Sequence, residues 1–330
     1  MYMPRQFLII ALAMLIGCEL GFVQESSGAS SAYPAKPVRM VIPYGVGGST
    51  DILSRIVALA LSERLGVQIV VDNRPGANGR IATMLVKEAS ADGYTLLMAS
   101  NGGHTANVTM YAKPGYDPLN DFASVALVAT LPMLLAVNSS SAVSSFKDLI
   151  TLAKTKPRAV TFGHPGVGSS PYFTGKLLDQ AADINTLDVP YKSGGAAVVD
   201  AIAGNITMVY AGLPAIIQYV KSGMLRPLAV SSAKRSHFLP NIPAISEYYS
   251  DFNIVFWVAA IAPRGVPQAL VSKLNSEINH ILGLQRTIDL FATQGATPAR
   301  MTPKELDDFI RNDLVMTKKI AKEAGVKLLQ

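Results

Sequence analysis

The sequence predicts a two-lobed α/β fold, in which each lobe is a mostly parallel sheet flanked by helices and crossing strands join the lobes. Short apolar runs alternate with helical patterns from residue 33 onward, an order typical of parallel sheets. Several runs, such as Ile69-Val70-Val71, are continuously apolar, as expected of strands that helices cover on both faces. The alternation is interrupted near residues 138–141 and again over residues 232–253. We therefore predict one lobe from residues 33–137 plus 253–330 and a second lobe from residues 138–252.

Length and composition place the chain among globular proteins. Its 330 residues leave room for two domains of ordinary size, and 49% of them are hydrophobic. The formal net charge is +6, but the lysines and arginines are scattered and form no basic run. This pattern argues against nucleic-acid binding and predicts a diffuse positive field that speeds the encounter with small anions. We expect a monomer.

The first 32 residues have the pattern of a signal peptide. Arg5 precedes an apolar run over residues 7–17, which is too short to span a bilayer as a helix. Two cleavage sites fit the pattern: the lipobox-like Leu15-Ile16-Gly17-Cys18, which would place Cys18 under a lipid, and the small residues that end at Ala32. With either site the protein is exported, and its folded part holds no cysteine for a disulfide or a thiolate metal site.

The predicted elements follow in chain order. Strands are expected over residues 38–42, 67–72, 94–99, 126–137, 159–163, 186–190, 206–211, 225–231 and 254–262. The last of these is expected to cross back to the first lobe. Helices are expected over residues 52–65, 267–282 and 303–324, among others. Thr302-Pro303-Lys304-Glu305 predicts a capping box for the last helix, which is expected to pack on the first lobe.

Small-residue turns follow most of the predicted strands. They are Gly47-Gly48-Ser49-Thr50, residues 73–79, Ser100-Asn101-Gly102-Gly103, and residues 166–170, 193–195 and 211–214. In an open α/β sheet such turns lie at the carboxyl ends of the strands, where ligands bind. Because half of the turns come from each part of the chain, they predict a cleft with two walls that present backbone N–H groups.

Residues 43–51 form the turn between the first strand and the first helix. The N–H groups of a first helical turn lack intrahelical partners and the helix dipole places roughly half a positive charge there, so this turn attracts an anion. It matches neither standard nucleotide loop, because no lysine follows the glycines and the spacing differs from G-x-G-x-x-G. Taken alone it also suits a plain connection, but the recurrence of such turns favours a carboxylate cradle. The candidate ligand-binding residues are Tyr44, Gly47, Gly48, Ser49, Thr50, Ser100, Asn101, Gly168, Ser169, Ser170, Tyr172 and Ala211.

Other chemistries have less support in the sequence. The four histidines, His104, His164, His237 and His280, are far apart and lack partners at i+4, so we predict neither a metal site nor a cofactor. Ser169 and Ser170 lie outside a G-x-S-x-G motif. Their hydroxyls are left with three roles: capping a helix, binding a ligand carboxylate, or acting as a nucleophile. Asp51 fits the positive end of its helix, and Lys192 faces either an anion or solvent.

Several stretches together resemble one family of bacterial receptors. They are Tyr33-Pro34-Ala35-Lys36-Pro37, Pro43-Tyr44 with Gly47-Gly48 and Asp51, Asp72-Asn73-Arg74-Pro75-Gly76-Ala77, Asp92-Gly93-Tyr94-Thr95-Leu96-Leu97, Tyr116-Asp117-Pro118 with Asp121-Phe122, Gly166 with Gly168-Ser169, Val189-Pro190-Tyr191-Lys192, Leu228-Ala229-Val230, and Trp257 followed by Ala262-Pro263. From residue 33 to the C-terminus the chain resembles the solute-binding receptors of tripartite tricarboxylate transporters, the Bug-type family.

The resemblance implies a non-catalytic periplasmic receptor with a type II periplasmic-binding-protein fold that closes on a small carboxylate. It implies that main-chain N–H groups and hydroxyls of both lobes hold this carboxylate, here from Gly47, Gly48, Ser49 and Thr50 and from Gly168, Ser169 and Ser170. It also implies delivery to a permease made of one large and one small membrane subunit. The alternatives are a secreted esterase-like hydrolase that uses Ser169 or Ser170, and a receptor that presents its ligand to a membrane sensor.

Three positions depart from the family's usual pattern. Tyr172 stands where histidine is common, Ser193 interrupts the usual Pro-Tyr-Lys-Gly, and Ala211 stands where aspartate is frequent. An aspartate at position 211 could pair with a ligand ammonium. Its absence therefore argues against an amino acid and for a mono- or dicarboxylate, aromatic acids included.

Overall fold

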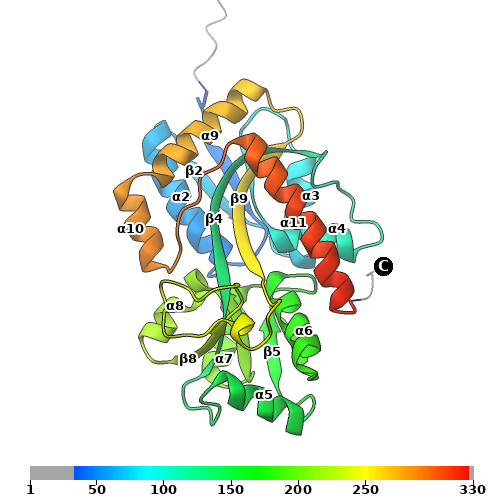
Figure 1. Ribbon diagram of the computed structural model, residues 1–330. Coiled ribbons are helices and arrows are strands. Elements are labelled where there is room, and N and C mark those ends of the chain that lie inside the picture. The colour runs from blue at the N-terminus through cyan, green and yellow to red at the C-terminus, as the bar shows by residue number, and fades with distance from the viewer. Residues whose placement is uncertain (1–32, 327–330) are drawn as a thin grey trace, which may run out of the picture. The chain divides into compact units, whose positions relative to one another are not determined.

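The computed structural model describes residues 33–326, and the chain divides into two units, Met1–Ala35 and Lys36–Gln330. The second unit carries the fold (Figure 1). The predicted signal peptide, with Cys18 and Ala32, lies outside the described residues. Among the residues that are described, no helix is both long and apolar enough to cross a membrane.

Within residues 33–326, nine strands form one mixed sheet in the order β2-β1-β3-β9-β4-β7-β5-β6, with β8 paired to β4. They are β1 (Val38–Ile42), β2 (Ile69–Asn73), β3 (Thr95–Ser100), β4 (Phe122–Asn138), β5 (Thr161–His164), β6 (Leu187–Pro190), β7 (Met208–Gly212), β8 (Leu225–Val230) and β9 (Val255–Pro263). Each predicted strand is confirmed, with ends shifted by a few residues at most.

Two long strands join the lobes. In the first lobe β1 pairs in parallel with β2 and β3, and in the second lobe β5 pairs in parallel with β6 and β7. All pairings of β4 and β9 are antiparallel, including the pairing of these two strands with each other. Figure 1 shows β4 and β9 running side by side from one lobe into the other. The predicted crossing strands are thus confirmed. The lobe boundaries at residues 137 and 253 stay a proposal.

The helices cover the two faces of the sheet. They are α2 (Ser49–Leu65), α3 (Arg80–Lys87), α4 (Asn107–Met110), α5 (Phe146–Thr155), α6 (Ser170–Ala182), α7 (Gly194–Ala203), α8 (Leu213–Lys221), α9 (Gln268–Leu282), α10 (Gln285–Thr293) and α11 (Pro303–Glu323), with short turns η1 (Ala77–Gly79), η2 (Gly102–Ala106) and η3 (Ile245–Glu247). In Figure 1, α5 to α8 surround the strands of the second lobe, and the other labelled helices surround the first lobe.

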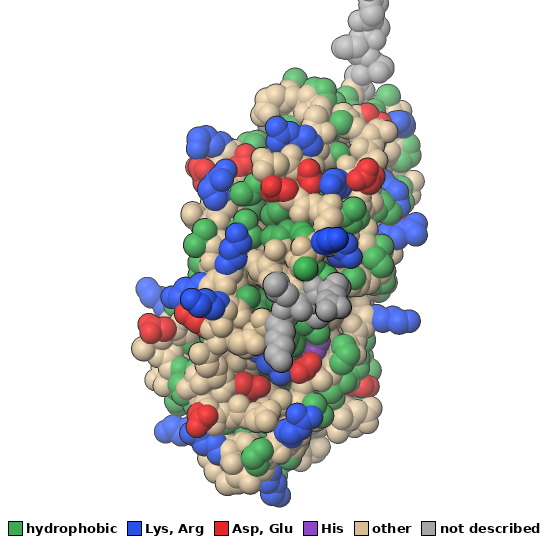
Figure 2. Space-filling view, turned by 90° about the vertical axis from the view of Figure 1, so that its right-hand side faces the viewer, with side chains coloured by type: hydrophobic (Ala, Val, Ile, Leu, Met, Phe, Trp, Pro, Cys, Tyr) green, Lys and Arg blue, Asp and Glu red, His purple; other side chains and the backbone are tan. Residues whose placement is uncertain are grey.

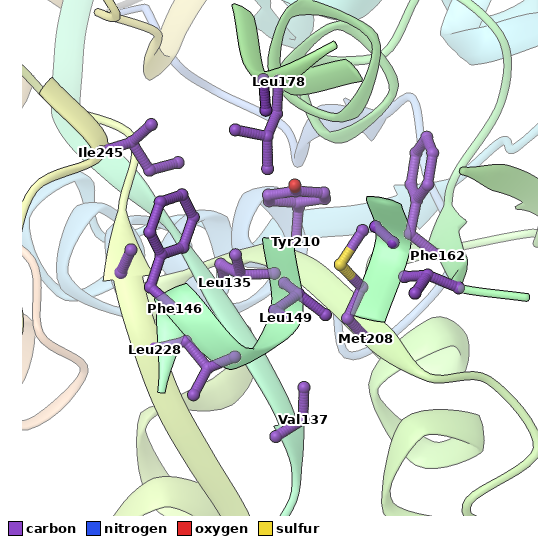
Figure 3. Packing of buried hydrophobic residues seen from close by; sticks show 14 of the residues in the cluster. Leu135, Val137, Phe146, Leu149, Phe162, Leu178, Met208, Tyr210, Leu228 and Ile245 are labelled. Atoms are coloured by element: carbon purple, nitrogen blue, oxygen red, sulfur yellow. The ribbon is translucent and has the colours of Figure 1, made fainter. Parts of the chain in front are cut away.

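Alternate residues of β4 enter different cores. Leu135 and Val137 belong to the cluster that α5 and α6 cover, which Figure 3 shows. Leu134 and Ala136 belong to the cluster that α7 and α8 cover. Successive strand residues point to opposite faces, so a strand between two helical layers needs apolar residues at every position. This burial explains the unbroken apolar run that predicted the strand.

The C-terminal helix α11 packs as the sequence predicts. The Thr302 hydroxyl accepts from the Glu305 N–H at 3.3 Å, and the Glu305 carboxylate accepts from the Thr302 N–H at 2.8 Å, which confirms the capping box. Leu306 and Ile310 belong to the core of the first lobe. Ala321, near the end of α11, also packs in a cluster with Phe173 of α6. The helix therefore contacts both lobes.

Charged side chains are dispersed over the surface that Figure 2 shows. Lysines and arginines alternate there with acidic and neutral side chains and form no single basic patch on this face. This dispersion matches the scatter of basic residues along the sequence.

Candidate functional site

Four helix N-termini meet at one small cavity between the lobes. The cavity has a volume of about 40 Å³, and its lining includes Ser49 and Thr50 of α2, Ser170 of α6, Gly194 of α7 and Ala215 of α8. Each of these helices follows a parallel strand, so the cavity lies where an open α/β sheet binds its ligand. The described residues that line the cavity include no aspartate, glutamate, lysine or arginine. The local field therefore comes from helix ends, which are positive.

The N-terminus of α2 has no side-chain cap. Gly48 is the N-cap residue, with an extended backbone, and no side chain among residues 33–326 caps the amides that follow it. Ser49 and Thr50 are buried at 8% and 2% exposure. Amides of a first helical turn lack intrahelical partners, so the Ser49 and Thr50 N–H groups are available to an anion in the cavity.

Asp51 shapes the turn that precedes α2. Its Oδ2 accepts from the Gly47 N–H at 3.0 Å, and its Oδ1 accepts from Arg55 Nε at 3.0 Å and Asn73 Nδ2 at 2.9 Å. Burial alone would raise the pKa of Asp51, but the hydrogen bonds from Arg55, Asn73 and Gly47 hold this pKa below its ordinary value. Asp51 therefore does more than complement the helix dipole. Its contact with Gly47 competes with the predicted role of the Gly47 N–H as a ligand donor.

The N-terminus of α6 offers fewer free donors. Ser169 is the N-cap residue, and its hydroxyl accepts from the Tyr172 N–H at 3.4 Å. Pro171 has no N–H group, so the Ser170 amide is the first-turn donor left for a ligand. Helix capping, one of the three roles considered for these serines, is thus observed for Ser169.

Hydrogen bonds cross the cleft and hold the lobes together. They include Ser49 Oγ to the Gly212 carbonyl at 3.1 Å, Ser170 Oγ to Asn101 Oδ1 at 2.7 Å, and the Gly45 N–H to the Lys192 carbonyl at 3.3 Å. The structure is therefore a closed conformation, with the turns of the two lobes in direct contact.

Tyr44 connects the cavity to the core of the first lobe. Its hydroxyl accepts from Ser100 Oγ at 3.3 Å and donates to Asn78 Oδ1 at 3.2 Å. Burial raises the pKa of Tyr44 to about 12, so the phenol stays neutral at physiological pH.

The structure brings many of the predicted site residues together. Those that line the cavity are Tyr44, Gly48, Ser49, Thr50, Ser169, Ser170 and Ala211. Gly47 is engaged by Asp51, and Ser100 is fully buried against Tyr44. Tyr172 packs instead on His164, with the ring centroids 5.1 Å apart.

Asn101 and Gly168 line a second cavity of about 310 Å³. Ser170 lines both cavities, and the second also contains Trp257 and Asp313. Burial raises the pKa of Asp313, whose carboxylate accepts from the Thr105 hydroxyl. In the described part of the chain, no group of three or more His, Cys, Asp or Glu residues is placed to hold a metal ion.

Sequence reasoning missed several residues that line the small cavity. Gly194 and Gly212 lie in turns that the sequence marks, so their position after strands could have identified them. Met133 and Phe256 come from β4 and β9, and no local signal distinguishes them from other apolar residues of buried strands.

Two α/β lobes joined by crossing strands, with helix ends facing the cleft between them, define a solute-binding protein of the periplasmic-binding-protein class. The model of the family described as tripartite tricarboxylate transporter family receptor matches residues 53–326. The chain belongs to this receptor family, which confirms the resemblance seen in the sequence.

Relatives and solved structures agree with this assignment. Protein BugT of Bordetella pertussis is 35% identical over 304 residues, which cover 91% of this chain and 93% of BugT. The structure of Rpa4515 of R. palustris with adipate matches with a TM-score of 0.87 and 34% identity, over 90% of this chain and 100% of that one. MatC (Rpa3494) from Rhodopseudomonas palustris with bound malate matches with a TM-score of 0.83 and 25% identity, over 87% and 99% of the two chains. These likenesses confirm the predicted fold class.

Proposed function

We propose that this receptor captures a small carboxylate between its lobes and delivers it to the membrane permease of a tripartite tricarboxylate transporter. The observation that carries this proposal is the convergence of four helix N-termini on a cavity whose lining residues bear no charge. Each helix end contributes roughly half a positive charge, and the ends of α2 and α6 add the free amides of Ser49, Thr50 and Ser170. A carboxylate leaving water needs such hydrogen bonds to compensate for its lost hydration.

Closure provides the capture mechanism. A carboxylate in the cavity touches the N-termini of α2 and α6 together only when the lobes approach each other. Because these contacts exist in one state only, ligand binding shifts the population toward the closed state. We assign the ligand contacts to the amides of Ser49, Thr50 and Ser170 and to the Thr50 hydroxyl. The Ser49 and Ser170 hydroxyls donate across the cleft instead, and Ser169 caps α6.

The residues that line the small cavity indicate which class of ligand it binds. Met133, Phe256 and Ala211 present apolar surface next to the helix ends. The lining holds no carboxylate that could pair with an ammonium group, so we propose a mono- or dicarboxylate, aromatic acids included, as the ligand. Two solved relatives, which contain adipate and malate, support the carboxylate class.

Membership in the receptor family implies a periplasmic location and a permease partner. We propose that residues 1–32 direct export, with cleavage either before Cys18 or after Ala32. Cleavage before Cys18 would tether the receptor to the membrane through a lipid.

The contacts of the two serines favour the receptor over the hydrolase. Ser169 Oγ accepts from the Tyr172 N–H, and Ser170 Oγ donates to Asn101. In these contacts neither hydroxyl is paired with a histidine that could act as a general base.

Thermal unfolding with a panel of ligands tests the proposed function. The purified protein is heated with adipate, malate, benzoate or a neutral sugar. A ligand present at a hundred times its Kd stabilises the native state by about 2.7 kcal/mol, so at least one acid should raise the Tm measurably. The double variant Ser169→Ala and Ser170→Ala should show a smaller rise. A response to the sugar with none to any carboxylate would contradict the proposal.

A further inference from the structure

The imidazole of His164 holds the start of the loop over residues 166–170, which leads from β5 into α6 in the second lobe. The side chain is fully buried at the end of β5, and its Nδ1 accepts a hydrogen bond from the Gly166 N–H at 3.1 Å. A ring nitrogen that accepts from an amide carries no proton, so the proton of the neutral ring lies on Nε2. This Nε2 donates to Asp188 Oδ2 at 3.3 Å. The contacts of the two nitrogens therefore set a single tautomer.

We propose that His164 is a positioning residue for ligand capture, whose neutral ring fixes Gly166 and whose protonation at Nδ1 releases the loop and weakens carboxylate binding. This inference rests on the proposed function, because it concerns the affinity of the same cleft for its ligand. His164 itself does not line the cavity and acts through the backbone of the loop.

The position of Gly166 affects Ser169 and Ser170 because the backbone of the turn connects them. Gly166 has φ of 136°, a conformation that residues with a side chain rarely adopt. Its carbonyl accepts from the Ser169 N–H at 3.1 Å, which closes the turn before α6. A Cβ on Gly166 would lie 3.3 Å from Asn78 Cβ in the first lobe, so the loop also packs closely against that lobe. A shift of Gly166 therefore disturbs both the α6 N-terminus and the closed contact between the lobes.

Charged and titratable groups surround the imidazole on several elements. Asp188 of β6 is paired with Lys176 of α6 at 2.8 Å, and Lys176 also lies 3.8 Å from Asp179. The Tyr172 ring of α6 packs edge-on against the imidazole, and the buried Tyr210 lies on the neighbouring strand β7. Because Lys176 already balances Asp188, the network does not require a charged imidazole. Burial lowers the pKa of His164, so the neutral ring predominates at pH 7.

Protonation removes the acceptor on which Gly166 depends. A proton on Nδ1 would face the Gly166 N–H, and two donors cannot share one hydrogen bond. A buried donor left without a partner is unfavourable, so the loop must move. If the bound state requires the neutral ring, affinity falls by up to about tenfold for each pH unit below the pKa of His164 in the free protein.

Binding measured by calorimetry between pH 7.5 and pH 5 tests this inference, with whichever of adipate, malate and benzoate binds the wild type at pH 7.5. The key variant is His164→Asn, because its amide oxygen can accept from the Gly166 N–H but does not titrate. We expect this variant to bind within about threefold of the wild type at pH 7.5 and to lose less affinity than the wild type on acidification. Protonation of the ligand affects both proteins alike and cancels in the comparison.

Two control variants distinguish the titration of His164 from that of other groups as the cause of the pH dependence. Burial raises the pKa of Asp179 to about 6, so Asp179 also titrates in this range, and Asp179→Asn should keep the wild-type pH dependence. The exposed His280 on α9 serves as a remote histidine, and His280→Asn should also keep it. Nitrogen-15 NMR of the wild type should show the proton of His164 on Nε2.

The outcomes distinguish this inference from the proposed function. Three results would overturn the inference and leave the receptor role intact. The wild type and His164→Asn could show equal pH dependence of binding, or Asp179→Asn could abolish that dependence instead. NMR of the wild type could also show the His164 proton on Nδ1. If no acid of the panel binds the wild type at pH 7.5, the proposed function fails and the inference falls with it.

Discussion

Ser49 Oγ in the first lobe donates a hydrogen bond to the Gly212 carbonyl in the second lobe, with 3.1 Å between the two oxygens. Ser49 begins α2, and Gly212 is the N-cap residue of α8. A Cβ on Gly212 would lie 2.6 Å from Ser49 Oγ, so the absence of a side chain lets the helix ends approach this closely. Because the contact joins residues of different lobes, it reports on closure, and substitutions at such contacts can test the mechanism.

Removal of the Ser49 hydroxyl should weaken ligand binding. Ser49→Ala deletes a buried hydrogen bond worth about 0.5–1.5 kcal/mol, which corresponds to a roughly two- to tenfold rise in Kd. Ser54 offers a matched control on the same helix, because it is buried and its hydroxyl has no hydrogen-bond partner in the described structure. Calorimetry should show unchanged affinity for Ser54→Ala. Equal losses for the two variants would mean that the cross-lobe contact has no role in capture.

A methyl group at Gly195 should block closure, whereas one at Gly194 should not. A Cβ at Gly195 would lie 2.7 Å from the Gly47 carbonyl oxygen, a backbone atom, but a Cβ at Gly194 meets no atom of the described residues within 4 Å. Overpacking costs about 1–3 kcal/mol, so Gly195→Ala should raise the Kd by roughly 5- to 150-fold. Small-angle X-ray scattering should show ligand-induced compaction for Gly194→Ala and little for Gly195→Ala. Normal compaction of Gly195→Ala would show that the lobes close less tightly than the structure indicates.

Asp51 should stabilise the fold in a pH-dependent way. Its native pKa is lowered, so its contribution is complete above the ordinary carboxyl pKa of 3.8 and is lost as the pH falls through the native value. Asp51→Asn should therefore reduce the free energy of unfolding by about 1–3 kcal/mol at pH 7, and the difference from wild type should shrink below pH 4. Urea unfolding measures this effect, with Asp289→Asn on the exposed face of α10 as the control. A difference that grows on acidification would contradict the assigned contacts.

An acid at position 211 should compete with the ligand. Ala211 lines the cavity among the helix ends, so Ala211→Asp would place a carboxylate where we expect the ligand's own. Affinity for organic acids should fall by at least tenfold, whereas the similarly shaped but neutral Ala211→Asn should lose less. If both variants bind acids equally well, the field at this position is not what selects the ligand.

The sequence predicts the strands well because each is an apolar run between small-residue turns. It does not predict the order of the strands in the sheet. β9 pairs with β3 and β4, and these partners precede it by more than a hundred residues, so no local pattern encodes the pairing. The sequence indicated the mixed sheet only through the last predicted strand, residues 254–262, which was expected to cross back to the first lobe.

The candidate site, like the fold, could be predicted only in part from the sequence. Turns at the carboxyl ends of strands identify Ser49, Thr50 and Ser170 from local sequence, because every such turn opens a helix. Which amides remain free depends on distant side chains, since Asn73 and Arg55 orient the carboxylate that engages Gly47. The sequence did not predict a positioning role for His164 for a related reason. Its partner Asp188 lies on another strand, and an isolated histidine at the end of a strand has no motif around it.

A crystal structure of the protein with a bound organic acid shows whether the helix ends hold a carboxylate. We expect one carboxylate group in the small cavity, with its oxygens about 3 Å from the first-turn amides of α2 and from the Ser170 amide of α6. A ligand bound outside this cavity, or a neutral group of the ligand at the helix ends, would contradict this expectation.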